Sequence, residues 1–134
     1  MSAGKRGGPR ELTAIYKARL LAAYTIDICT NEKNFPLEYE TALTNDIIQT
    51  AKDIYLYARR ANRIKVESND TRTERRLLQE MAIRRCGDLC DLIELAQPVY
   101  HLETRRIKYW EDQTDYVQNL LERWMNSDIR RYGM

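Results

Sequence analysis

The residues of this sequence that are best suited to chemistry are its arginines. The chain has 134 residues and 22 basic side chains, of which 16 are Arg and 6 are Lys. A guanidinium group binds a phosphate through two parallel hydrogen bonds and stacks on flat rings, whereas an ammonium group acts as a point charge. Because the formal net charge is only +2, any preference for an anionic partner depends on where the fold gathers these arginines.

Residues that would support catalysis or hold a metal ion are sparse. The sequence has a single His, His101, which cannot supply the two Glu-x-x-His motifs of a di-metal helical bundle. It also lacks a Gly-rich phosphate loop, a G-x-S-x-G motif and a CxxC pair. We therefore expect no catalytic residues, no metal site and no cofactor, and we predict that the protein is not an enzyme.

The cysteines and the lengths of the apolar runs indicate the cellular compartment in which we expect the protein. Cys29, Cys86 and Cys90 are an odd number of thiols in a chain without a secretion signal, so a disulfide framework is not expected. Cys86 and Cys90 share a helix face, either as half of a metal site or, in the reading we favour, as small core residues. No apolar run approaches the roughly 18 residues that a membrane span needs. We expect a cytoplasmic protein without membrane contact.

Composition and periodicity place the arginines on helices. Only five Gly and three Pro occur, and three of the Gly and one Pro fall in the first ten residues. We read residues 1–10 as a flexible basic tail and residues 11–133 as one helical domain. Apolar residues then recur at steps of three or four, the period of an amphipathic helix. The four predicted stripes are Leu12, Ile15, Ala18, Ala22, Ile26 and Cys29; Leu43, Ile47, Ala51, Ile54, Ala58 and Ala61; Leu78, Ala82, Cys86, Leu89, Ile93 and Ala96; and Ile107, Trp110, Thr114, Val117, Leu121 and Trp124.

Short breaks separate these stripes. The segment from Asn31 to Pro36 interrupts the first pair, and residues 66–70 interrupt the second. Thr71 with Glu74 forms a capping-box sequence for the third helix, with Asn69 or Asp70 as alternative caps. Pro98 is expected to end or kink that helix. Four helices with short connections predict an all-α fold, an up-down-up-down antiparallel four-helix bundle.

This topology would collect basic segments that are distant in sequence at one end of the bundle. Residues 1–10, 59–76 and 122–131 carry formal charges of +3, +4 and +1, together +8, which leaves −6 for the rest of the chain. Such a field concentrates a polyanion at one end. Outside the tail, the candidate nucleic-acid-binding residues are Arg59, Arg60, Arg63, Lys65, Arg72, Arg75, Arg76, Arg123, Arg130 and Arg131.

The helix dipole helps to separate a binding role from an ordinary helix-end preference. Arginines at a predicted helix C-terminus, such as Arg59, Arg60 and Arg63, are favoured by the dipole alone. Arg72, Arg75 and Arg76 are predicted in a first helical turn, where the dipole disfavours cations, and this favours contact with phosphate or with an acidic partner. Tyr57 and Tyr132, next to this group, are either stacking platforms for unpaired bases or ordinary half-exposed aromatics.

Two segments resemble a known family. They are Phe35-Pro36-Leu37-Glu38-Tyr39-(x)3-Leu43, running on to Arg60-Ala61-Asn62, and Leu120-Leu121-(x)2-Trp124-(x)2-Ser127-Asp128-(x)-Arg130-Arg131-Tyr132-Gly133. Together they resemble the accessory variability determinant (Avd) proteins of diversity-generating retroelements, within the wider four-helix-bundle family that includes proteins encoded in 23S ribosomal RNA intervening sequences. The resemblance extends over about residues 15–133.

The resemblance implies a function. Avd-like proteins are non-catalytic bundles that assemble into a ring-like homo-pentamer, bind RNA or DNA through basic surface, and bind the reverse transcriptase of the element. That complex copies template RNA into error-rich cDNA for mutagenic retrohoming. By motif position, the Arg59–Arg63 cluster and Arg130-Arg131 would lie on the basic end, while Phe35, Pro36 and Leu43 would be structural. Family members are often more basic overall, so the −6 remainder is a departure, consistent with either a narrower RNA footprint or an acidic surface for the polymerase.

Two alternatives stay open at this point. One is an intervening-sequence four-helix-bundle protein that binds ribosomal RNA and has no polymerase. The other is an oligomeric protein–protein adaptor whose basic end docks an acidic partner without nucleic acid. Steep salt dependence of RNA binding would distinguish the nucleic-acid readings from the adaptor.

Overall fold

The computed structural model describes residues 9–133, with side chains from Thr13 onward. These residues form four long helices and no strand: α1 (Pro9–Cys29), α2 (Asn45–Arg63), α3 (Asn69–Tyr100) and α4 (Thr104–Tyr132). Two short turns, η2 (Leu37–Tyr39) and η3 (Glu40–Thr44), lead into α2. The predicted all-α class is confirmed for this part of the chain, and none of its helices is both long and apolar enough to cross a membrane.

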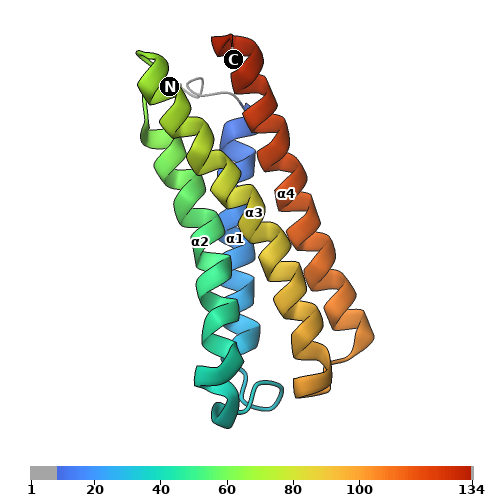
Figure 1. Cartoon of the computed structure of the whole chain (residues 1–134). Helices are drawn as coiled ribbons and strands as arrows, with labels where there is room; N and C mark the ends of the chain where they lie inside the picture. The colour runs from blue at the N-terminus through green and yellow to red at the C-terminus, as the bar shows by residue number, and fades with distance from the viewer. Residues whose placement is uncertain (1–8, 134) are drawn as a thin grey trace, which may run out of the picture.

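The four helices lie side by side as a helical bundle (Figure 1). The α2–α3 connection and the end of α4 lie at one end, where Arg72 Nη1 donates a hydrogen bond to the carbonyl of Tyr132 at 2.5 Å. The α1–α2 and α3–α4 connections lie at the other end. There the ring of Phe35, just before η2, lies 4.6 Å from the ring of Tyr100 at the end of α3.

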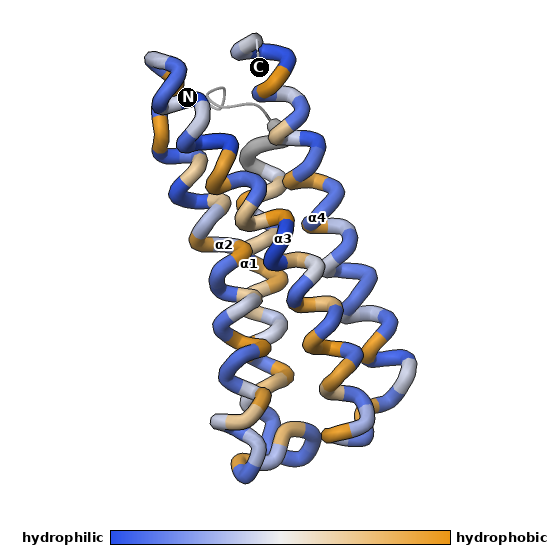
Figure 2. The backbone as a smooth tube through the Cα atoms, in the orientation of Figure 1, coloured by the Kyte–Doolittle hydropathy of each residue, from blue (hydrophilic) through white to orange (hydrophobic). Residues whose placement is uncertain are grey.

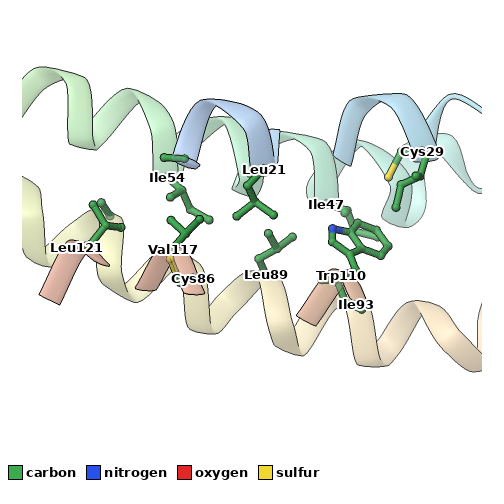
Figure 3. Packing of buried hydrophobic residues seen from close by; sticks show 14 of the residues in the cluster. Leu21, Cys29, Ile47, Ile54, Cys86, Leu89, Ile93, Trp110, Val117 and Leu121 are labelled. Carbon is green, nitrogen blue, oxygen red and sulfur yellow. The ribbon is translucent and has the colours of Figure 1, made fainter. Parts of the chain in front are cut away.

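The core runs along the whole bundle axis. All members of the second and fourth predicted stripes are buried. In the third stripe, the members from Ala82 to Ala96 are buried. In the first stripe, four members are buried: Ile15, Ala18, Ala22 and Cys29. Hydrophobic and hydrophilic residues alternate around each helix with the helical turn (Figure 2). Leu21, Ile54, Leu89 and Val117, one from each helix, meet in the interior (Figure 3). Burial of one apolar stripe per helix is what holds the helices together.

Two residues of the predicted stripes are placed differently by the structure. Ile26 is 39% exposed, because α1 buries Leu21, Thr25 and Ile28 instead. Each residue turns an α-helix by about 100°, so Ile26 lies roughly 100° or more around the helix from Leu21, Thr25 and Ile28. Leu78 is only half-buried, because Gln79 occupies the interior position beside it. The side chain of Leu12 lies outside the described ones.

The boundaries of α1 and α3 also differ from the prediction. α1 begins at Pro9, inside the segment predicted as tail, and residues 1–8 of that tail lie outside the described residues. The cap of α3 is Ser68, whose Oγ accepts from the backbone N–H of Thr71 at 3.2 Å, while Thr71 Oγ1 accepts from the backbone N–H of Ser68 at 3.0 Å. Thr71 is therefore the third helical residue, and the predicted caps were wrong.

Pro98 was predicted to end or kink the third helix, and the end comes two residues after it. α3 continues through Pro98 to Tyr100 and ends at His101, which adopts the left-handed conformation with φ 57°. Proline lacks a backbone N–H and its ring crowds the carbonyl four residues earlier, so at Pro98 the disruption is confined to the last two turns of the helix. The backbone N–H of His101 closes the end by donating to the carbonyl of Gln97 at 2.8 Å.

Candidate nucleic-acid interface

Three segments that are distant in sequence meet at one end of the bundle. Arg75 on α3 donates from Nη1 to the carbonyl of Ile64, just after α2, at 3.1 Å, and from Nε to Asp128 on α4 at 2.6 Å. Together with the bond from Arg72 to Tyr132, these contacts join the end of α2, the start of α3 and the end of α4. We call this region, residues 59–76 and 122–131, the basic end.

Arg75 itself is not available to a ligand, which corrects its place among the candidate binding residues. Arg75 belongs to a buried network: the whole residue is 6% exposed, and its guanidinium group lies 5.3 Å from the ring of Trp124. Gln79 Nε2 donates to the same Asp128 oxygen at 2.8 Å. The guanidinium group of Arg75 is thus held by protein acceptors, and its role is to fix the packing of α3 against α4 and the end of α2.

Arg72 and Arg76 are only partly available. Arg72 is half-buried and bonded to the Tyr132 carbonyl. Arg76 is half-buried too, and its Nε lies 4.0 Å from a carboxylate oxygen of Glu80 one turn along α3. Since α3 begins at Asn69, Arg75 and Arg76 lie in the second turn, where the helix dipole is weak. The dipole argument for an anionic partner therefore no longer applies to these two residues.

The remaining candidates present their charges to solvent. Two of them, Arg60 and Arg63, lie in the last turn of α2, and Arg130 and Arg131 lie in the last turn of α4. No salt bridge between described residues engages any of this set. Arg59 is half-buried, and the exposed members are Arg60, Arg63, Lys65, Arg123, Arg130 and Arg131.

At the basic end, two tyrosine rings lie close to arginine guanidinium groups. The guanidinium carbon of Arg60 lies 5.5 Å from the ring centroid of Tyr57, and that of Arg131 lies 5.8 Å from the ring centroid of Tyr132. Both tyrosine rings are half-buried. Flat guanidinium and phenol groups at a surface can stack on an unpaired base, and they do so without reading its sequence.

Sequence reasoning missed the buried polar members of the network, Gln79 and Asp128, although a signal for them exists. The third stripe continues backwards from Ala82 in steps of three and four to Gln79 and Arg75, and all three are buried. The fourth stripe continues forwards from Trp124 by four residues to Asp128, which is 4% exposed. A polar residue that falls in register with an apolar stripe marks a buried, paired group.

The environment of all three thiols favours their protonated form. Burial raises the pKa of Cys29 to about 12 and, with the nearby carboxylate of Asp115, raises that of Cys90 to about 12. Burial likewise raises the pKa of Cys86. Among the described residues, no group of three His, Cys, Asp or Glu side chains is arranged to hold a metal ion.

Comparisons with known proteins add no relative. No protein-family model matches the chain, and searches of curated proteins and of solved structures found no match to it.

Proposed function

We propose that this protein is a non-catalytic, nucleic-acid-binding accessory subunit of a diversity-generating retroelement. In this role it binds template RNA or cDNA and the reverse transcriptase, in the cytoplasm, and supports mutagenic retrohoming without performing a chemical step. The retroelement context rests on the resemblance of Phe35–Leu43 and Leu120–Gly133 to Avd proteins. The binding role rests on the charge of the basic end.

The observation that carries the binding role is the meeting of two of the predicted basic segments, residues 59–76 and 122–131, at one end of the bundle. The Arg75–Asp128 and Arg72–Tyr132 contacts hold Arg60, Arg63 and Lys65 on the same end of the bundle as Arg130 and Arg131. Several unpaired guanidinium groups on one rigid end favour contacts to successive phosphates. The proposal includes the up-down-up-down topology, which the placement of the connections in Figure 1 supports.

We further propose that the protein works as a homo-oligomer, with a ring of five subunits as the form implied by the resemblance. The outer surface of α1 supports this, because Tyr16 is 48% exposed and Leu20, one turn further along the same side of the helix, is 42% exposed. Tyr109 and Tyr116 of α4 are also exposed, and Tyr116 lines a groove of about 250 Å³ with Leu20. Burial of this apolar stripe against a second copy would remove it from water, and a ring would multiply weak phosphate contacts.

A charge-reversal experiment tests the binding role. Replacement of Arg59, Arg60 and Arg63 together by Glu should leave the helical circular dichroism unchanged and weaken RNA binding strongly. The matched control replaces Lys33, Arg105 and Arg106 by Glu, which changes the net charge equally at the opposite end of the bundle. Equal loss in both triple variants would show that net charge alone matters, and unchanged binding in the first would exclude the α2 cluster.

Salt dependence and assembly separate the proposal from its alternatives. For contacts to single strands, the logarithm of the affinity should fall with the logarithm of salt concentration by about 0.7 per neutralised phosphate. A protein–protein adaptor should show no appreciable RNA binding at any salt concentration. A monomer at micromolar concentration in light scattering would count against the ring, and Leu20→Glu should dissociate an oligomer that Leu95→Glu, on α3, leaves intact.

The retroelement context has its own test. A gene for this protein should lie beside a reverse transcriptase gene and a template/variable repeat pair, and the purified protein should retain that reverse transcriptase in a pull-down. An intervening-sequence protein would instead lie within a ribosomal RNA gene and bind ribosomal RNA without a polymerase.

A further inference from the structure

A groove of about 380 Å³ opens between α2 and α3 beside the basic end. It is lined by Tyr57 of α2 and by Met81, Arg84, Arg85 and Asp88 of α3. Tyr57 is half-buried and packs against the core, while Met81 is 38% exposed. The floor of the groove is therefore partly apolar, with a flat ring and a polarizable thioether that suit contact with an aromatic ligand.

One of the two arginines that line the groove, Arg85, is paired with carboxylates. Arg85 Nη1 donates to Asp88 Oδ2 at 2.7 Å, and Arg85 Nε lies 3.4 Å from a carboxylate oxygen of Asp53 on α2. Two carboxylates thus neutralise Arg85, and a phosphate placed beside them would be repelled. The interior of the groove suits a neutral, flat group that can exchange hydrogen bonds with a guanidinium group and a carboxylate.

Two arginines without a carboxylate partner lie in and beside the groove. Arg60 extends from the basic end, with its guanidinium carbon 5.5 Å from the ring centroid of Tyr57. Arg84 is exposed, and no salt bridge or hydrogen bond between described residues engages its side chain. A nucleotide within a strand has a flat base between two phosphates, and this arrangement fits a partly apolar groove with one unpaired guanidinium group in its lining, Arg84, and a second, Arg60, beside Tyr57.

We infer that this groove binds one unpaired base of a single-stranded nucleic acid, packed on Tyr57 and Met81, with its flanking phosphates on Arg60 and Arg84. The inference rests on the proposed function and narrows its ligand to unpaired strands. A paired base in a duplex keeps both faces stacked on its neighbours and cannot enter the groove. The groove extends the basic end along α2 and α3, and it adds Met81 and Arg84 to the binding surface.

The test compares single and double strands on full-length protein. Fluorescence anisotropy measures the affinity for a short labelled oligouridine strand and for an RNA duplex of the same length. Tyr57→Leu removes the ring but keeps apolar packing, and it should weaken binding of the single strand about tenfold, within the range known for base–aromatic stacking, with the duplex affinity unchanged. Tyr57→Phe should behave as the parent protein.

Two further variants keep the test decisive if Tyr57→Leu proves unstable in thermal melting. Met81→Ala, at an exposed position, should weaken binding of the single strand about threefold. Arg84→Ala should lower the slope of the logarithm of single-strand affinity against the logarithm of salt concentration by about 0.7, the value for one lost phosphate contact. Arg105→Ala, an exposed arginine at the opposite end, is the control and should change neither quantity.

The outcomes distinguish this inference from the proposed function. If the parent protein binds neither strand nor duplex, the proposed function fails and the groove inference fails with it. The groove inference is overturned if the parent binds RNA and the Tyr57, Met81 and Arg84 variants bind it with the same affinity. It is also overturned if these variants lose the same affinity for the single strand and for the duplex. In both cases the basic end remains the binding surface.

Discussion

Arg75 Nε lies 2.6 Å from Asp128 Oδ2, and the two side chains are 8% and 5% exposed. The residues are 53 positions apart, and their pairing holds the second turn of α3 against the last two turns of α4. Burial of two charges costs solvation energy that their attraction only partly returns. The pair is therefore better understood as a device that sets the register of α3, α4 and the end of α2 than as a source of stability.

Removal of one partner should be costly. Arg75→Met leaves the Asp128 carboxylate buried with only Gln79 as a donor, so the free energy of unfolding should fall by about 3–5 kcal/mol. Chemical denaturation measures this. The double variant Arg75→Met with Asp128→Leu removes both charges and should recover most of the loss, while exposed Arg63→Met should change stability by about 0.5 kcal/mol or less. A single variant as stable as the parent would contradict the structural role of the pair.

The buried hydrogen bond between α1 and α4 should also be measurable. Trp110 Nε1 donates to Thr25 Oγ1 at 3.1 Å, and both residues are fully buried. Thr25→Val keeps the shape but leaves the indole N–H without an acceptor, which should cost about 1–3 kcal/mol. Thr25→Ser retains the hydroxyl and should cost less. If both variants lose the same stability, methyl packing rather than the hydrogen bond accounts for the effect.

Gly87 offers a route to a more stable protein. It lies in the middle of α3 on an exposed face, and a Cβ atom built there meets nothing within 4 Å. Gly87→Ala should therefore stabilise the protein by about 0.5–1 kcal/mol, because alanine loses less backbone entropy in a helix. Thermal melting should show a rise of a few degrees. Gly133→Ala, where φ is +74°, should give no such gain, since that conformation is strained for alanine.

Stability should also depend on the protonation of Glu111. Partial burial, together with the nearby carboxylates of Glu94 and Asp115, raises the pKa of Glu111 above its usual value of 4.5. The folded state then binds a proton more tightly than the unfolded state, so stability falls as the pH rises above about 4.5. Glu111→Gln should raise stability at pH 7 and flatten this decline in denaturation measured across pH. Glu38→Gln, at an exposed site, should do neither, and an unchanged profile for Glu111→Gln would contradict the carboxylate pairing.

The helices and their buried faces were predictable because their signal is local. Every residue from Leu43 to Ala61 in the second stripe, and from Ile107 to Trp124 in the fourth, is buried as its spacing predicted. The step of three or four residues depends only on the geometry of an α-helix. Where two registers compete on one helix, as at Thr25 and Ile26, the choice depends on a hydrogen bond to Trp110, 85 residues away, and spacing alone does not reveal it.

The candidate site shows the same division. The amino-acid sequence by itself determined the class of fold, the four apolar stripes and the excess of arginine in residues 59–76, since composition and periodicity are properties of neighbouring residues. Only the tertiary structure decided which arginines are free. Arg75 and Arg60 are the same residue type in the same basic segment, yet one pairs with Asp128 inside the bundle and the other is exposed beside Tyr57. The difference arises from contacts between helices, because the free energy of a charge depends on the groups and the solvent around it rather than on its neighbours in sequence.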